Sequence, residues 1–163
     1  SKTKLLQKMQ RSREAMRLVI DRIAPHREIY PQWRIHEMLA HLAGWDEAAT
    51  ACLTRHLKGN PAQPIATHGI DHYNSQSIRS RAGLSLQQII QEWEFEREKL
   101  KGAIRGLSSA QLQDITVYPW GGRGTILNLI KGIIAHENEH AREIEQMLDA
   151  DAQDDGERTP RPL

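Results

Sequence analysis

Residues 125–149 read TILNLIKGIIAHENEHAREIEQMLD, and this stretch gives the clearest indication of how the chain folds. Its apolar side chains return at helical spacing, so that one face of a long helix is apolar. These inward positions are Ile126, Ile130, Ile133, Ile144 and Met147. An apolar helix face has to be covered by other elements of the same fold. The rest of the sequence should therefore supply partners for this helix.

Three other segments show the same periodicity and predict three more amphipathic helices. The first ends at Pro25 and the second at Gly59-Asn60-Pro61, which are signals that stop helices. The third begins at a capping box formed by Ser85 and Gln88 and stops at Gly106. Their inward positions are Leu5, Met9, Met16, Val19, Ile20 and Ile23, then Ile35, Met38, Leu39, Leu42, Trp45, Ala49 and Leu53, and then Leu86, Ile89, Ile90, Trp93, Arg97, Leu100 and Ile104.

The connections between these segments indicate a bundle. Residues 61–83 are polar and lack a clear period, so we interpret them as a long crossover with a turn or more of helix at 73–78. Residues 117–125, VYPWGGRGT, predict a loop. The predicted fold is all-α, a four-helix bundle with a long crossover between the second and third helices. We expect residues 1–150 to form a single domain and the polar residues 151–163 to form a disordered tail.

The composition limits what the protein binds. Its 163 residues carry 22 basic and 21 acidic side chains, a net charge of +1, which offers no binding surface for nucleic acid or an anionic membrane. Cys52 is the only cysteine, which excludes an internal disulfide, and the N-terminal residues lack the apolar core of a secretory signal. We therefore expect a cytoplasmic protein with a small-molecule substrate and no nucleic-acid or membrane partner.

The stretch quoted above also contains a metal-binding pattern. His136 and His140 are four residues apart and lie on one face of the predicted helix, where two imidazoles can bind the same ion. With 8 histidines in the chain, chance supplies such a pair roughly 0.4 times, but only roughly 0.03 times with Glu after the first histidine. The pair alone is therefore a weak motif, and the pair with its glutamate is a more specific one.

With Glu137, the pair spells H-E-x-x-H, the zinc signature of a class of metalloproteases. Such a protease needs a third ligand further along the chain. Gln146 stands where a histidine would be needed, and the only later glutamate, Glu157, lies in the predicted tail. The pattern therefore favours a different kind of metal site.

We predict that the third ligand is His41. It lies beside the inward face of the second helix, three residues from Met38 and four from Trp45. A single inward histidine is more often hydrogen-bonded to a backbone carbonyl than bound to a metal. An inward histidine that meets an inward pair in a bundle favours three imidazoles on one ion. His36, about 140° away around the helix, is expected at the surface.

Four features of the sequence, in this order, resemble the DinB/YfiT-like superfamily. They are W-x-x-x-E-x-L-A-H-L-A-G-W-D at residues 33–46, Asn74 in the crossover, P-W-G-G-x-G-T at residues 119–125 and the final H-x-x-x-H pair. The likeness covers residues 1–150 and is nearest the branch that includes the colibactin self-protection proteins. One difference is Arg34, where a serine or threonine helix cap is expected.

The resemblance implies a four-helix bundle, often dimeric, in which His41, His136 and His140 hold a divalent metal, zinc or nickel. Similar proteins include thiol-dependent transferases and isomerases, whereas the self-protection branch opens a reactive cyclopropane without a clear need for metal. We expect a metal-dependent transferase or hydrolase acting on a small reactive or thiol-linked molecule, with a low-molecular-weight thiol as a second cofactor. Two alternatives stay open, a metal-free protein that binds or hydrolyses a reactive metabolite and a helical bundle without enzymatic activity.

The chemistry of such a site depends on an open position on the metal. Three neutral imidazoles leave the ion positively charged, which lowers the pKa of bound water to about 7 or holds a thiol as thiolate. Glu137 is the candidate catalytic base, with a supporting or solvent-exposed carboxylate as the alternative. Glu37 and Glu143 either hold a ligand imidazole by its free N–H or form ordinary surface ion pairs. Tyr73 and Asn74 are expected at the mouth of the pocket.

Overall fold

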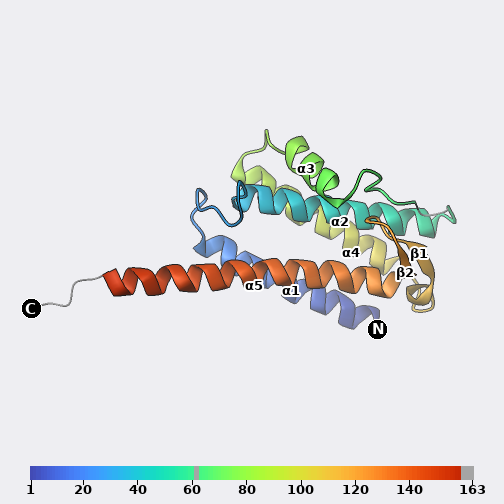
Figure 1. Ribbon diagram of the computed structural model, residues 1–163. Helices are drawn as coiled ribbons and strands as arrows, with labels where there is room; N and C mark the ends of the chain where they lie inside the picture. The colour runs from blue at the N-terminus through green and yellow to red at the C-terminus, as the bar shows by residue number, and fades with distance from the viewer. Residues whose placement is uncertain (61–62, 159–163) are drawn as a thin grey trace, which may run out of the picture.

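The computed structural model describes residues 1–60 and 63–158, and helices form most of this structure (Figure 1). The elements are α1 (Lys2–Arg22), α2 (Ile35–Leu57), α3 (Ile70–Ser80), α4 (Leu86–Arg105), the 3-10 turn η1 (Gln111–Gln113), β1 (Ile115–Val117), β2 (Arg123–Thr125) and α5 (Ile126–Arg158). Helices α1, α2, α4 and α5 form a bundle, which confirms the predicted fold. Over the described ranges, none of the helices has both the length and the apolar character that crossing a membrane requires.

The bundle consists of two pairs of neighbouring helices. Helix α1 packs along α5, α2 packs along α4, and contacts between α2 and α5 join the two pairs. Most of the predicted inward positions are buried, and Leu39, Trp93 and Ile130 are each 0% exposed. The half-buried exceptions are Ile20, Leu86, Ile90 and Met147. Burying one large apolar side chain contributes roughly 1.5–3 kcal/mol. These faces therefore hold the bundle together.

A layer of buried charged side chains lies between two apolar clusters of the core. Each bundle helix contributes one of them, Arg13 from α1, Asp46 from α2, Arg97 from α4 and Glu137 from α5. Two positive and two negative charges balance, and paired charges of this kind can remain ionised inside a protein. The layer fixes the relative positions of all four helices.

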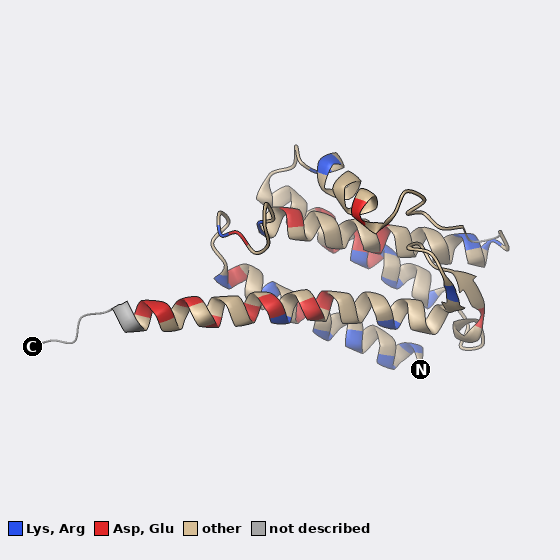
Figure 2. Ribbon diagram, in the orientation of Figure 1, with Lys and Arg blue, Asp and Glu red and all other residues tan. Residues whose placement is uncertain are grey.

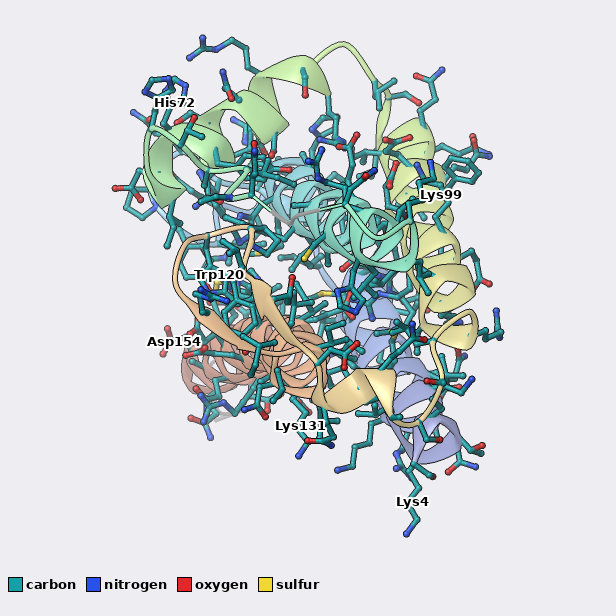
Figure 3. All side chains as sticks on the ribbon, turned by 90° about the vertical axis from the view of Figure 1, so that its right-hand side faces the viewer. Lys4, His72, Lys99, Trp120, Lys131 and Asp154 are labelled. Atoms are coloured by element: carbon teal, nitrogen blue, oxygen red, sulfur yellow. The ribbon has the colours of Figure 1, made fainter. Side chains whose placement is uncertain are left out.

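The crossover contains an 11-residue helix, α3, which is longer than the turn predicted there. In the end-on view of the bundle, α3 lies outside α2, with His72 on the outer face (Figure 3). A Cβ atom added to Gly44 of α2 would lie 2.3 Å from Oγ of Ser77 on α3. The Tyr73 hydroxyl also donates to the Gly44 carbonyl oxygen at 2.7 Å. Glycine at position 44 thus allows α3 to rest directly on α2.

The segment predicted as a loop at residues 117–125 instead forms the turn and second strand of a hairpin. The paired residues of β1 and β2 are Ile115 with Thr125, Thr116 with Gly124 and Val117 with Arg123. The turn contains Gly121 and Gly122, whose φ angles of 97° and 82° favour glycine. The Pro119 carbonyl accepts hydrogen bonds from the backbone N–H groups of residues 65 and 66, both at 2.9 Å. The hairpin is therefore fastened to the segment that precedes α3.

Helix α5 is longer than predicted, because it ends at Arg158 rather than near Asp149. Residues 151–158, which were expected to belong to a disordered tail, instead continue the helix. The remaining residues of that predicted tail, 159–163, lie outside the described part of the chain.

Ion pairs connect this polar extension of α5 to α1 and to the segment that follows it. Arg22 lies 3.0 Å from Asp149, and Arg27 lies 3.0 Å from Asp151. Figure 2 shows acidic residues, in red, at several positions along this end of α5. Solvent screens the charges of exposed pairs of this kind, so they add little to stability. The extension is therefore held by weak polar contacts rather than by the apolar packing on which the prediction was based.

Candidate metal centre

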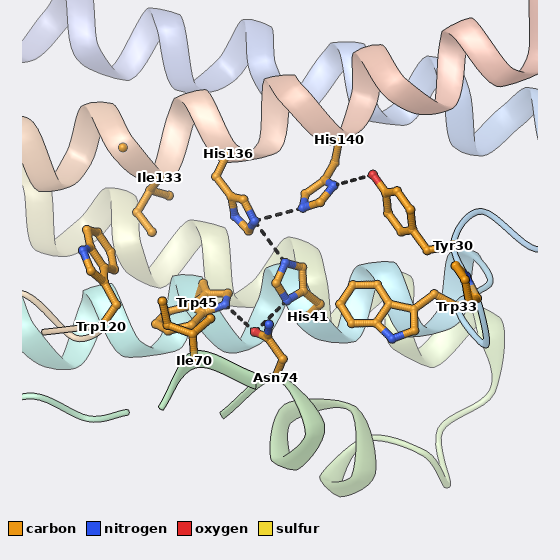
Figure 4. Close-up of a pocket in the computed structure, with 12 residues that line it drawn as sticks. Tyr30, Trp33, His41, Trp45, Ile70, Asn74, Trp120, Ile133, His136 and His140 are labelled. Carbon is orange, nitrogen blue, oxygen red and sulfur yellow. Dashed lines mark hydrogen bonds between the residues drawn. The ribbon is translucent and has the colours of Figure 1, made fainter. Parts of the chain in front are cut away.

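Three histidine side chains meet between α2 and α5 (Figure 4). Nε2 of His136 lies 3.0 Å from Nε2 of His41 and 2.9 Å from Nε2 of His140. The three predicted ligands each offer a nitrogen, and these nitrogens lie within 4.8 Å of one another. Two nitrogens bound to one ion through bonds of about 2.0–2.1 Å are themselves about 3 Å apart. The cluster could therefore hold a metal ion.

The orientation of His41 is fixed by Asn74 on α3. The side-chain oxygen of Asn74 lies 3.0 Å from Nδ1 of His41 and accepts a hydrogen bond from the indole N–H of Trp45 at 2.8 Å. Because an indole N–H can only donate, the Asn74 atom that faces it is the acceptor. Nδ1 of His41 therefore carries the proton and donates it. This leaves a lone pair on Nε2, which faces the other two imidazoles.

His140 is held in a comparable way by Tyr30, which lies before α2. The Tyr30 hydroxyl lies 3.0 Å from Nδ1 of His140 and donates a hydrogen bond to the carboxylate of Glu143. Since its single hydrogen is used on Glu143, the hydroxyl accepts from Nδ1 of His140. Nε2 of His140 therefore also presents a lone pair. Of the two roles left open for Glu143, a support for a ligand histidine or a surface ion pair, the contacts favour the first, which it fulfils through Tyr30.

Burial keeps the three imidazoles in the neutral form that binds metals. It lowers the pKa of His41 to about 3, and the nearby His136 and His140 act in the same direction. The pKa of His140 falls to about 4, because of burial and then of His136, and burial also lowers the pKa of His136. A neutral His136 ring has only one N–H to offer to two neighbouring acceptors. A cation that accepts the lone pairs of all three rings therefore suits these nitrogens better than hydrogen bonds among the rings do. Among cations, zinc and nickel bind nitrogen ligands well.

A cavity of about 560 Å³ lies against the histidine cluster (Figure 4). Its lining includes Tyr30 and Trp33 from before α2, Trp45 from α2 and Trp120 from the hairpin. This volume is typical of a site for a small organic molecule. Such a molecule would have direct access to the histidines.

The two crossover residues expected at the pocket mouth have different positions. Asn74 lines the cavity, as well as holding His41. Tyr73 instead packs its ring 4.6 Å from that of Trp45, and its hydroxyl donates a hydrogen bond to the backbone of α2. Tyr73 thus helps to attach α3, whereas Asn74 belongs to the site itself.

Glu137, the candidate base, does not line the cavity. Its carboxylate is 0% exposed and lies 3.1 Å from Nε of Arg13 and 2.8 Å from Nη1 of Arg97. It also accepts hydrogen bonds from the indole N–H of Trp93 at 3.0 Å and from the Ser12 hydroxyl at 3.1 Å. Both carboxylate oxygens are thus occupied within the buried charged layer. This position suits a structural carboxylate and not a general base.

Two other residues considered from the sequence lie outside the cluster. Glu37 accepts a hydrogen bond from the backbone N–H of Arg34 at 3.0 Å, which helps to cap α2 where a serine or threonine is missing. His36 was expected at the surface but is half-buried, with Nε2 2.7 Å from the Leu84 carbonyl oxygen. Its ring is therefore hydrogen-bonded to the segment between α3 and α4 and takes no part in the metal centre.

Comparisons with known proteins identify the family and the fold. Residues 10–144, which include all three histidines, match the family model of the DinB superfamily. No curated protein matches the chain. A crystal structure of a Streptococcus pneumoniae protein from the Northeast Structural Genomics Consortium has a similar fold, with a TM-score of 0.74, 17% identity and 90% of each chain covered. This likeness concerns the fold alone, and the family match does not select a branch.

Proposed function

The chain belongs to the DinB superfamily, and we propose that it is a metal-dependent transferase or hydrolase acting on a small reactive or thiol-linked molecule. The observation that supports this most strongly is the meeting of His41, His136 and His140 at the wall of a cavity. Structural zinc sites are usually closed by four protein ligands, whereas catalytic sites have three and keep one position open. Three imidazoles beside a cavity fit the catalytic arrangement.

Each part of the site has a role in this proposal. A divalent cation, zinc or nickel, would supply a Lewis acid that activates water or a thiol. Asn74 and Tyr30 accept the Nδ1 protons of His41 and His140, and so keep both Nε2 atoms free for the cation. The aromatic walls would displace water from the faces of a bound molecule, and fewer waters strengthen electrostatic interactions at the reacting groups.

The H-E-x-x-H pattern has a different use here from the one in metalloproteases. In those enzymes the glutamate acts as the general base beside zinc. Here the two histidines of the pattern face the cavity, whereas Glu137 is held by two arginines in the core. The third imidazole comes from an earlier helix, α2. These differences support a DinB-type site rather than a protease site.

A second candidate is a metal-free protein that binds or hydrolyses a reactive metabolite, as the resemblance to the colibactin self-protection branch suggests. One observation favours it, namely that the cavity is lined mainly by apolar side chains. Such walls would hold an organic molecule whether or not a metal is bound. The two candidates therefore differ in whether the histidines need a cation.

Elemental analysis of protein produced without a histidine tag separates these candidates. The metal-dependent proposal predicts about one equivalent of a transition metal in the wild-type protein and its loss in His41→Ala. His72→Ala is a matched control, because it disrupts an exposed pair with His68, whose ring lies 5.3 Å away. Less than about half an equivalent in the wild type would contradict the metal-dependent proposal and favour the metal-free one. Stoichiometric metal in His41→Ala would remove His41 from the site.

A further inference from the structure

We propose that the cavity selects a neutral substrate with a flat, apolar body, oriented with its reactive group toward the three imidazoles. This names the substrate class for the site described above and in that respect rests on the proposed function. The evidence comes from the cavity walls and not from the histidines. The two ideas can therefore fail separately.

The walls present flat aromatic faces from three segments of the chain. The Trp33 ring lies 4.9 Å from that of His41, and the Trp120 ring lies 6.0 Å from that of Trp45. Ile133 of α5 and Ile70 of α3 add apolar surface. Aromatic side chains pack best against other flat apolar groups, in stacked or edge-to-face geometry at about 4.5–7 Å. The lining therefore favours an aromatic or similarly flat molecule.

Two of these aromatic walls, Trp45 and Tyr30, already use their polar groups within the protein. The indole N–H of Trp45 donates to Asn74, and the Tyr30 hydroxyl bonds to both His140 and Glu143. They contribute apolar surface to the cavity while their polar atoms remain satisfied. Of Trp45 and Tyr30, a substrate therefore meets mainly the apolar surface.

Among the described residues, the lining of the cavity contains no Lys, Arg, Asp or Glu. A carboxylate, phosphate or sulfonate on the body of a substrate would lose its hydration here without gaining an ion-pair partner. A low-molecular-weight thiol with several charged groups would have to keep those groups in solvent. The cavity thus disfavours a substrate that carries a charged group on the part remote from the histidines.

Gly132 controls the width of the cavity on the α5 side. It lies one helical turn before His136, and a Cβ atom added to it would be 3.8 Å from the Trp120 ring. This is an ordinary contact, so a larger side chain would extend into the space between α5 and Trp120. Gly102 on α4 provides a matched control, because a Cβ atom there meets nothing within 4 Å.

The probes for the test are 2-naphthol and its 6-sulfonate, which share a ring system and differ by one charge. Calorimetric titration of metal-free and zinc-loaded protein should show binding of 2-naphthol to both forms, and binding of the sulfonate that is weaker by about tenfold or more. Gly132→Leu should weaken 2-naphthol binding by about tenfold or more, whereas Gly102→Leu should leave it unchanged. Thermal melts of both variants establish that they are folded.

Equal affinity for the two probes, no binding of 2-naphthol, or unchanged binding by folded Gly132→Leu would overturn the proposal. The comparison of probes on the wild type decides the matter even when Gly132→Leu fails to fold. Selective binding of 2-naphthol by a protein that takes up no metal would support the cavity proposal and reject the metal-dependent function. Stoichiometric metal with equal binding of both probes would support the metal-dependent function and overturn the cavity proposal.

Discussion

The side-chain oxygen of Asn74 lies 3.0 Å from Nδ1 of His41, so a residue of the crossover helix orients a candidate metal ligand of the bundle. The same oxygen accepts the indole N–H of Trp45, which fixes which atom of Asn74 faces the imidazole. The site is therefore not complete within the four bundle helices. It depends on how α3 is placed against α2.

Replacing Asn74 with alanine should weaken zinc binding by about 10–100-fold, the usual effect of removing a group that holds a ligand histidine. The reason is that the His41 ring would lose the acceptor that fixes its tautomer. Competition with a chromophoric chelator measures the affinity. Asn128→Ala is the control, because Asn128 is exposed on the first turn of α5. Equal zinc affinity in both variants would show that Asn74 does not support the site.

Tyr30→Phe should keep the aromatic wall but release His140, because only the hydroxyl contacts Nδ1. We expect zinc affinity to fall by about tenfold, with little change in thermal stability. Tyr118→Phe is a suitable control, since it removes a hydroxyl that donates to the Thr125 carbonyl oxygen in the hairpin. If the two variants bind zinc equally well, Tyr30 has no positioning role.

Gly44→Ala should disturb the site through the contact between α2 and α3. The added methyl group would meet Oγ of Ser77 at 2.3 Å, which forces α3 away and carries Asn74 with it. We expect a loss of about 1–3 kcal/mol in the free energy of unfolding and weaker zinc binding. Combining the change with Ser77→Gly should recover both, relative to Ser77→Gly alone. Unchanged zinc affinity in Gly44→Ala would separate the position of α3 from the metal centre.

Glu137→Gln should act on stability rather than on chemistry. It removes one negative charge from a buried layer that contains Arg13 and Arg97, and leaves a buried positive charge without its partner. The free energy of unfolding in urea should fall by roughly 3–5 kcal/mol. The protein that remains folded should keep its metal. Wild-type stability combined with loss of turnover would instead identify Glu137 as the catalytic base.

Acid should destabilise the metal-free protein through the buried histidines. His41 has a pKa of about 3 when folded against an ordinary value of 6.5, so the unfolded chain binds more protons between these values. The contribution is therefore fully present above about pH 6.5 and is lost progressively as the pH falls toward 3. Urea unfolding of the wild type and His41→Asn across this range tests it. The slope against pH should be smaller in the variant, and identical slopes would refute the assignment.

The bundle and its three histidines could be predicted because each depends on helical spacing. Met38 and Trp45 place His41 on the inward side of α2, and both are buried. The spacing of four residues places His136 and His140 together on α5. Periodicity is a local property of one helix, so it remains valid when the helix enters the bundle.

The parts that were missed depend on contacts between distant segments. Tyr30 lies in an irregular segment, where an isolated bridge pairs it with Trp33 and no period predicts its direction. Strands β1 and β2 contain only three residues each, which is too short for an alternating pattern. Such positions are set by tertiary packing rather than by local sequence.

The role of Glu137 was hidden by its place inside the H-E-x-x-H pattern. A usable signal did exist, because an arginine stands between buried apolar positions on each of two other helices. Arg13 lies between Met9 and Met16 on α1, and Arg97 between Trp93 and Leu100 on α4. A carboxylate at an inward position of α5 would have been the expected partner of these arginines.

X-ray absorption at the metal edge of the untagged protein tests the central claim most directly, because it counts the imidazoles bound to the ion. We predict three in the wild-type protein, and loss of the ion in His41→Ala. A first shell with fewer than three imidazoles in the wild type, or one that is unchanged by His41→Ala, would contradict the account.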